Sequence, residues 1–143
     1  MINSKILVGI QFLMIFAILL PKSTAQLVNW WWILPLIASV TALWIFTHNR
    51  VGNFNITPEI RKDAKLIVTG PYRFVRHPMY SSLILFMLGI VLHWFSFLNF
   101  LFLLIMTFAL ALKAFREEKL WHVNDPSYEA YKKQTTMIIP YIL

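Results

Sequence analysis

The chain has 143 residues, of which 59% are hydrophobic and 16% aromatic, and its formal net charge is +7. This length suits one domain, and the apolar fraction is far above that of an ordinary soluble protein, so the composition predicts a membrane protein. A membrane surface accounts for the positive charge, and we expect no nucleic-acid partner. The absence of cysteine from the sequence excludes disulfides, a thiolate nucleophile and thiolate metal sites.

Four apolar segments predict an all-α integral membrane bundle of about four transmembrane helices, over residues 6–20, 30–47, 80–92 and 95–114. The first and third segments are shorter than the roughly 20 residues of a perpendicular span and would extend into their flanks. The third and fourth segments are expected to form a helical hairpin that turns at His93-Trp94.

The first span has a rival interpretation. Lys5, the apolar run after it and the small residues 23–25 resemble a secretory signal that is cleaved after Ala25. We favour a retained helix, and cleavage would leave the other spans oriented as before.

The distribution of Lys and Arg predicts the orientation of the spans. Of the thirteen Lys and Arg residues, only Lys22 lies in a loop on the side opposite to both termini. Cytoplasmic loops carry the excess of Lys and Arg, so both termini and the loop 48–79 are expected in the cytoplasm. The sequence therefore predicts a multi-pass protein of the inner, cytoplasmic membrane with its active site on the cytoplasmic side.

A polar linker over residues 53–65 leads into residues 66–69, which we expect to be a short extended or loop segment. The following stretch, Gly70 to Tyr80, places aromatic, cationic and imidazole groups between two apolar runs. Gly70-Pro71 predicts a turn, and Pro78 predicts the first turn of the third membrane helix.

His77 and Tyr80 are thereby placed at a helix N-terminus. Free N–H groups and the helix dipole at such a terminus favour an anionic ligand group. The alternative is a basic, aromatic interfacial anchor that stops the helix from sliding. The histidines at 48, 77, 93 and 122 lie in separate segments without metal-ligand spacing, so no metal site is predicted.

A second polar cluster, Lys113 to Leu120, follows the fourth span. Lys113 and Glu117 are four residues apart and therefore share a helical face. Glu117 and Glu118 point about 100° apart, so we expect one of them to face the site and the other to be solvated. The alternative is a solvated helix end with ordinary ion pairs.

At the beginning of the tail, one helix is expected to end and a second helix to begin. Asp125 is expected to cap, Pro126 to take the first helical position, and Tyr128 to Gln134 to form a short cytoplasmic helix. The apolar residues 138–141 then either fold over the mouth of the bundle or lie on the membrane as an anchor.

Four features together resemble the isoprenylcysteine carboxyl methyltransferase family and its bacterial relatives. They are VTGPYRFVRHPMY at 68–80, the apolar hairpin, EEKL at 117–120 and YEAYKKQTTMIIPYI at 128–142. The resemblance spans about half the chain in the expected order. It implies a single membrane domain over residues 1–143, with a cytoplasmic cofactor region over 65–80 and 113–141. The implied activity is methyl transfer from S-adenosylmethionine to a lipophilic or lipid-linked acceptor in contact with membrane lipids.

The resemblance also implies roles for individual positions. Lys113, Arg116 and Glu117 are expected to be catalytic, and Lys113 stands where the family has a substrate-contacting arginine. The positions implied for cofactor binding are Lys65, Leu66, Ile67, Val68, Tyr72, His77, Pro78, Met79, Tyr80 and Glu117.

The chemistry of these side chains agrees with the implied cofactor. Glu117 suits the ammonium or sulfonium, and Tyr72 and Tyr80 suit its apolar and aromatic parts. His77, together with nearby backbone N–H groups, suits its carboxylate. Methyl transfer is an in-line displacement, so the protein mainly has to align the reactants and exclude water.

The acceptor has two interpretations. A carboxylate acceptor, as in prenylcysteine methylation, needs no general base, whereas a phospholipid or small lipophilic amine needs a proton acceptor. Gln134 and Met137 stand where relatives often carry arginine, so the cofactor half of the pattern is better kept than the acceptor half. Two other classes are a non-enzymatic membrane protein that keeps the fold and a reductase with a nicotinamide cofactor, for which the cytoplasmic region is small.

Overall fold

The computed structural model describes residues 3–20, 29–49 and 65–139. Within these residues the fold is all-helical, as predicted, and an isolated parallel bridge between Val75 and Thr136 is its one piece of β-pairing. The sequence-predicted cleavage point after Ala25 and the linker residues 53–64 lie outside the described residues. The helices are α1 (Ser4–Leu19), α2 (Ile33–His48), α3 (Pro78–His93), α4 (Phe97–Asn124) and α5 (Tyr128–Gln134), with 3-10 turns η1 (Asn29–Trp32) and η3 (Gly70–Arg73).

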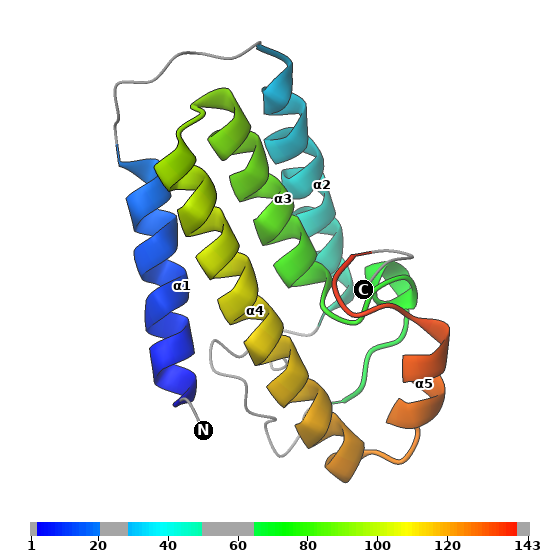
Figure 1. Ribbon diagram of the computed structural model, residues 1–143. Helices are drawn as coiled ribbons and strands as arrows, with labels where there is room; N and C mark the ends of the chain where they lie inside the picture. The colour runs from blue at the N-terminus through cyan, green and yellow to red at the C-terminus, as the bar shows by residue number, and fades with distance from the viewer. Residues whose placement is uncertain (1–2, 21–28, 50–64, 140–143) are drawn as a thin grey trace.

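The four long helices run side by side in the order α1, α4, α3, α2 (Figure 1). Helix α1 packs mainly on α4, and α2 packs mainly on α3. Helices α3 and α4 form the predicted hairpin, but its turn covers residues 94–96 and not His93-Trp94, because His93 is the last residue of α3. The start of α1, the turn η3, the last turns of α4 and all of α5 lie toward the other end of the bundle. The two polar clusters therefore meet at one end.

The ends of the helices follow from local sequence signals. The side chain of Asn3 accepts a hydrogen bond from Lys5 N (3.0 Å) and caps α1. Pro78 occupies the first position of α3, where its missing N–H costs nothing. Helix α5 has the predicted bounds, but Pro126 lies in the preceding turn and not in the helix, because Asp125 Oδ1 accepts from Ser127 N (2.9 Å) and holds a tight turn.

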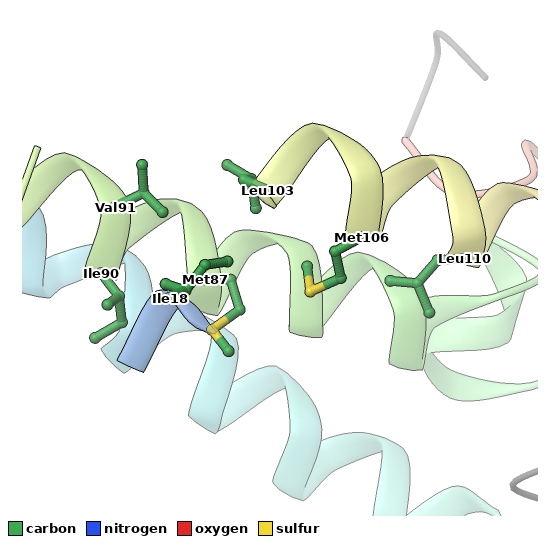
Figure 2. Close-up of a cluster of buried hydrophobic side chains, with 7 residues drawn as sticks. All are labelled: Ile18, Met87, Ile90, Val91, Leu103, Met106 and Leu110. Carbon is green, nitrogen blue, oxygen red and sulfur yellow. The ribbon is translucent and has the colours of Figure 1, made fainter. Parts of the chain in front are cut away.

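The central core joins α1, α3 and α4 (Figure 2). Outside it, α1 and α2 are apolar on nearly every side and expose large side chains such as Phe16 (63%) and Leu43 (66%). Helices of this kind are suited to lipid. Among the described residues, Trp30–His48 and Phe97–Asn124 are long and apolar enough to cross a membrane, and α1 and α3 are shorter apolar helices. The buried core residues are Ile18, Met87, Ile90, Val91, Leu103, Met106 and Leu110.

Two glycines permit close approaches around α2. A Cβ on Gly89 would lie 2.2 Å from Pro35 Cδ, so this glycine lets α3 press against the start of α2. Gly70 has a φ of +61° and lies against the ring of His48, where a Cβ would be 2.3 Å from Cδ2. These contacts fix the start of α2 against α3 and the end of α2 against η3.

Candidate active site

The turn η3 and the start of α3 form one corner of the candidate site. Phe74 N and Val75 N donate to Pro71 O (3.2 and 3.4 Å), which closes the turn. His77 is the N-cap of α3, and its O accepts from Tyr80 N (3.0 Å) and Ser81 N (3.2 Å). This geometry stacks the rings of His77 and Tyr80 almost parallel, with centroids 5.4 Å apart.

Glu117 of α4 meets these two rings. Tyr80 Oη donates to Glu117 Oε1 at 2.5 Å, and His77 Nδ1 lies 3.2 Å from Glu117 Oε2. The Glu117 side chain keeps 21% exposure, whereas that of His77 keeps 9%. The carboxylate is therefore held in one orientation and still reaches the surface of the cluster.

Glu118 is buried on the neighbouring side of α4, with 6% exposure of its side chain. Its Oε1 accepts from Arg76 Nε (2.6 Å) and its Oε2 lies 3.3 Å from Lys132 Nζ. The expectation that one of the two glutamates is solvated is therefore wrong. Protein covers the sides of α4 on which Glu117 and Glu118 lie, because the 74–77 segment and α5 wrap around the end of α4.

His77 lies between the two carboxylates. Its Nε2 is 3.6 Å from Glu118 Oε1, which is beyond hydrogen-bond distance, and has no hydrogen-bond partner in the described structure. Burial alone would lower the pKa of His77, but the contacts with Glu117 and Glu118 outweigh burial and hold that pKa above its ordinary value. The protonated imidazole is thus favoured in this site.

Tyr72 of η3 lies near the same carboxylate. Burial, and after it the charge of Glu117, raises the pKa of the Tyr72 hydroxyl to about 12, so this hydroxyl stays protonated. Asn49 Nδ2 donates to Tyr72 Oη (3.0 Å), and Tyr131 Oη donates to Tyr72 O (2.6 Å). The end of α2 and helix α5 therefore both fix Tyr72.

The segment after α5 runs parallel to residues 74–77. Arg76 N donates to Thr136 O (2.9 Å), and His77 N donates to Met137 O (3.0 Å). The guanidinium of Arg76 also donates to the carbonyl oxygens of Lys132 (3.2 Å) and Thr135. Of the two interpretations of the tail, folding over the bundle end is the one observed for residues up to 139. The amide of His77 is consequently bonded to the tail.

Lys113 and Arg116 face α1. Lys113 Nζ donates to Gln11 Oε1 (2.7 Å) and lies 5.2 Å from the centroid of the Tyr80 ring. Arg116 Nη1 donates to Ser4 Oγ (3.4 Å). Sequence reasoning missed Gln11, although a lone amide within an apolar run is a usable signal.

The family of this chain follows from comparison with known proteins. Residues 28–125 match the family model described as phospholipid methyltransferase. The chain belongs to the phospholipid methyltransferase family. This family is part of the isoprenylcysteine carboxyl methyltransferase-like group, so the resemblance predicted from the sequence is confirmed. No curated protein matches the chain.

Membership in the phospholipid methyltransferase family implies a membrane methyltransferase. The matched region contains α2, α3 and α4, and with them His77, Tyr80 and Glu117. Helix α1, helix α5 and the segment after α5 lie outside it.

The remaining sequence-predicted positions are spread around this cluster. Lys65 to Val68 form an irregular segment before η3, with side chains that are exposed or half-buried. On the first turn of α3, Pro78 is buried and Met79 is exposed. The structure therefore brings Tyr72, His77 and Tyr80 toward Glu117, while Met79 is open to the surroundings.

A cavity of about 610 Å³ lies between α2 and α3, on another face of α3 from Tyr80. Its lining is apolar apart from three hydroxyls and Trp44. Each hydroxyl already donates to a backbone carbonyl: Thr41 to Ile37, Ser82 to Met79, and Ser81 to Ile138, with His77 O 3.2 Å from Ser81 Oγ. The cavity is lined by Thr41, Trp44, Pro71, Phe74, Val75, Pro78, Ser81, Ser82, Ile84, Leu85, Leu88, Ile138 and Ile139.

Proposed function

We propose that this protein transfers a methyl group from S-adenosylmethionine to a lipid acceptor, with the cluster around Glu117 as the cofactor site. The observation that carries the proposal is the Glu117 carboxylate, fixed by Tyr80 Oη and His77 Nδ1 at the polar end of an apolar bundle. A held carboxylate beside aromatic rings suits a ligand with a cationic centre and an aromatic base. S-adenosylmethionine has both and supplies the methyl group when it is bound.

Each side chain of the site has its own role in this proposal. Glu117 attracts the ammonium or the sulfonium, and the rings of Tyr72 and Tyr80 flank the apolar and aromatic parts. His77 has carboxylates on both sides, so we assign it to orienting Glu117 and not to holding the cofactor carboxylate. Lys65 to Val68, which lead into η3, border the same corner. Lys113 and Arg116, on the α1 side of α4, are assigned to the acceptor.

The acceptor is proposed to be a lipid whose hydrocarbon chain occupies the cavity between α2 and α3. All three hydroxyls of the lining are bonded internally, so an alkyl chain is the suitable occupant. The polar group of such a lipid would extend from the cavity past the start of α3 to Tyr80, whose ring centroid lies 5.2 Å from Lys113 Nζ. The family description supports a phospholipid amine over a carboxylate as the methylated group. In that reaction the amine nitrogen would bond to the methyl carbon, S-adenosylhomocysteine would leave, and Glu117, the partly exposed carboxylate of the site, would accept the proton that the amine releases.

Calorimetry with S-adenosylmethionine tests the cofactor site. Loss of one hydrogen bond to a charged group costs about 1.5–3 kcal/mol, so Glu117→Gln is expected to weaken binding by about 10- to 100-fold. His77→Ala is expected to weaken binding as well, whereas Glu129→Gln, on the exposed face of α5, should bind as the wild type does. The proposal fails if the wild type shows no saturable binding, or if neither Glu117→Gln nor His77→Ala changes it.

A radiolabelled methyl group distinguishes the acceptors. After incubation with a total lipid extract, label in an alkali-stable product identifies an amine, because methyl esters lose their label in alkali. Label in an alkali-labile product would show that the acceptor is a carboxylate and not an amine. Saturable cofactor binding without any label transfer would support a non-enzymatic membrane protein that keeps the site.

A further inference from the structure

Helix α1 contains a polar side chain in an otherwise apolar stretch. Between Lys5 and the end of α1 at Leu19, Gln11 is the one polar side chain in the sequence. An amide within an apolar bundle is costly unless it has a partner, and such residues usually mark a functional site. Gln11 has a partner, Lys113 of α4, with Oε1 2.7 Å from Nζ.

Lys113 is the more unusual member of the pair. It is 2% exposed, and an ammonium at such a place is strongly disfavoured unless its donors are used. An ammonium has three N–H donors, and Gln11 accepts one of them. The ring of Tyr80 lies 5.2 Å away and adds an attraction between the cation and its π-face.

A chain of contacts links this pair to the proposed cofactor site. Gln11 holds Lys113, Lys113 lies over the Tyr80 ring, and Tyr80 Oη donates to Glu117. Helix α1 lies outside the region that matches the family, which begins at residue 28. The family match therefore assigns nothing to Gln11.

We propose that Gln11 is a positioning residue of the methyl-transfer site. It fixes the ammonium of Lys113 over the Tyr80 ring, where the remaining N–H donors bind the polar group of the acceptor. This inference rests on the proposed function, and it adds α1 to the elements that build the site. Gln11 acts through Lys113 and does not touch the reacting atoms.

A thermal-stability cycle tests the pair without any activity. Gln11→Leu leaves a buried ammonium without its acceptor and is expected to lower the Tm. Combining Gln11→Leu with Lys113→Met replaces both polar groups by apolar ones, which is often neutral, so the double variant should regain much of the lost Tm. Losses of Tm that simply add would overturn the pairing.

Activity separates positioning from folding. With tritiated S-adenosylmethionine and a total lipid extract, Gln11→Leu is expected to raise the apparent KM for lipid about tenfold or more, which is the effect of one lost charged hydrogen bond. Its affinity for the cofactor is expected to fall by less than this, because Gln11 reaches Glu117 only through Lys113 and Tyr80. The double variant should stay as impaired as Lys113→Met although its Tm recovers. Gln11→Glu, which keeps an oxygen acceptor, should retain most activity.

Phe12→Leu is the matched control, because Phe12 is the next residue of α1 and faces outward with 53% exposure. It should change neither the Tm cycle nor the KM. Recovery of activity together with Tm in the double variant, or an equal loss of cofactor affinity in Gln11→Leu, would reduce Gln11 to a structural residue. If the wild type transfers no label, the proposed function fails, whereas the Tm cycle still decides the pairing.

Discussion

His77 lies between the carboxylates of Glu117 and Glu118, with Nδ1 3.2 Å from one and Nε2 3.6 Å from the other. The two glutamates are neighbours in sequence but have different partners. Glu117 bonds to Tyr80 and keeps some exposure, whereas Glu118 is enclosed by Arg76 and Lys132. A single imidazole thus links a carboxylate that is suited to a ligand with one that holds the tail in place.

The charge of His77 makes this linkage dependent on pH. Its pKa is raised by folding above the ordinary value of about 6.5, so its contribution to stability is present below about pH 6.5 and is lost as pH rises through the folded-state pKa. We expect the difference in Tm between the wild type and His77→Gln to be largest at about pH 6 and to shrink toward about pH 9.

Thermal unfolding over that pH range measures the effect. His122→Gln is the control, because its pair with Glu129 is exposed and exposed pairs contribute little. A difference in Tm for His77→Gln that stays constant or grows with pH would contradict the linkage.

Sequence patterns identified some of these residues and not others. His77 and Tyr80 follow a Gly-Pro turn, and Pro78 begins the helix turn that contains Tyr80, so their placement at the start of α3 was predictable from local signals. The Gln11–Lys113 contact joins residues 102 positions apart and depends on how α1 packs on α4. No local propensity encodes such a pairing. The prediction that one of the two glutamates is solvated was wrong for the same reason, because the burial of Glu118 depends on tertiary packing.

Helix α3 is the element that separates the polar cluster from the apolar cavity. Tyr80, Leu83 and Met87 face the core with α4, whereas Pro78, Ser81 and Leu85 line the cavity toward α2. One helix thereby presents a polar corner on one side and space for a hydrocarbon chain on another.

Filling the cavity tests its proposed occupant. Leu85→Trp should displace part of a bound chain; at about 0.8 kcal/mol per methylene, the loss of about three methylenes would raise the KM for long-chain lipid about 50-fold. Affinity for S-adenosylmethionine should not change, because Leu85 lies on the cavity face of α3.

Leu104→Trp is the control, since Leu104 is half exposed on the outer face of α4. Rates with long-chain lipid that are the same in Leu85→Trp and Leu104→Trp would exclude the cavity as the chain site.

The bounds of the helices were predictable where proline, glycine or a capping side chain marks them. Helix α5 begins and ends as expected after the Asp125 turn. Helix α4 runs on to Asn124, well beyond the apolar segment predicted to end at residue 114, because Glu, Lys and Leu are good helix formers in water. Hydropathy predicted the span, and helix propensity determined the length of the helix.

At the scale of the whole molecule, both polar clusters, α5 and the start of α1 lie toward one end of the bundle, and the α3–α4 turn lies at the other (Figure 1). This arrangement suits the proposed topology, in which the distribution of Lys and Arg places the polar end in the cytoplasm.

Single cysteines can test that topology, because the sequence has none of its own. In intact cells, a membrane-impermeant maleimide is expected to label Phe95→Cys in the hairpin turn and to leave Lys133→Cys on α5 unlabelled. Both positions are exposed in the structure, so both should react after the membrane is dissolved. Labelling of both, or of Lys133→Cys alone, in intact cells would contradict the proposed orientation.

The pairing of residues 74–77 with residues 136–137 also sets an order of events during biosynthesis. Arg76 and His77 receive their backbone partners from Thr136 and Met137, which are translated after all four long helices. In a nascent chain whose helices are already inserted, the amides of Arg76 and His77 still lack their partners, Thr136 O and Met137 O. We expect the proposed cofactor site to form only when the segment after α5 has left the ribosome, so that a half-made chain does not bind S-adenosylmethionine.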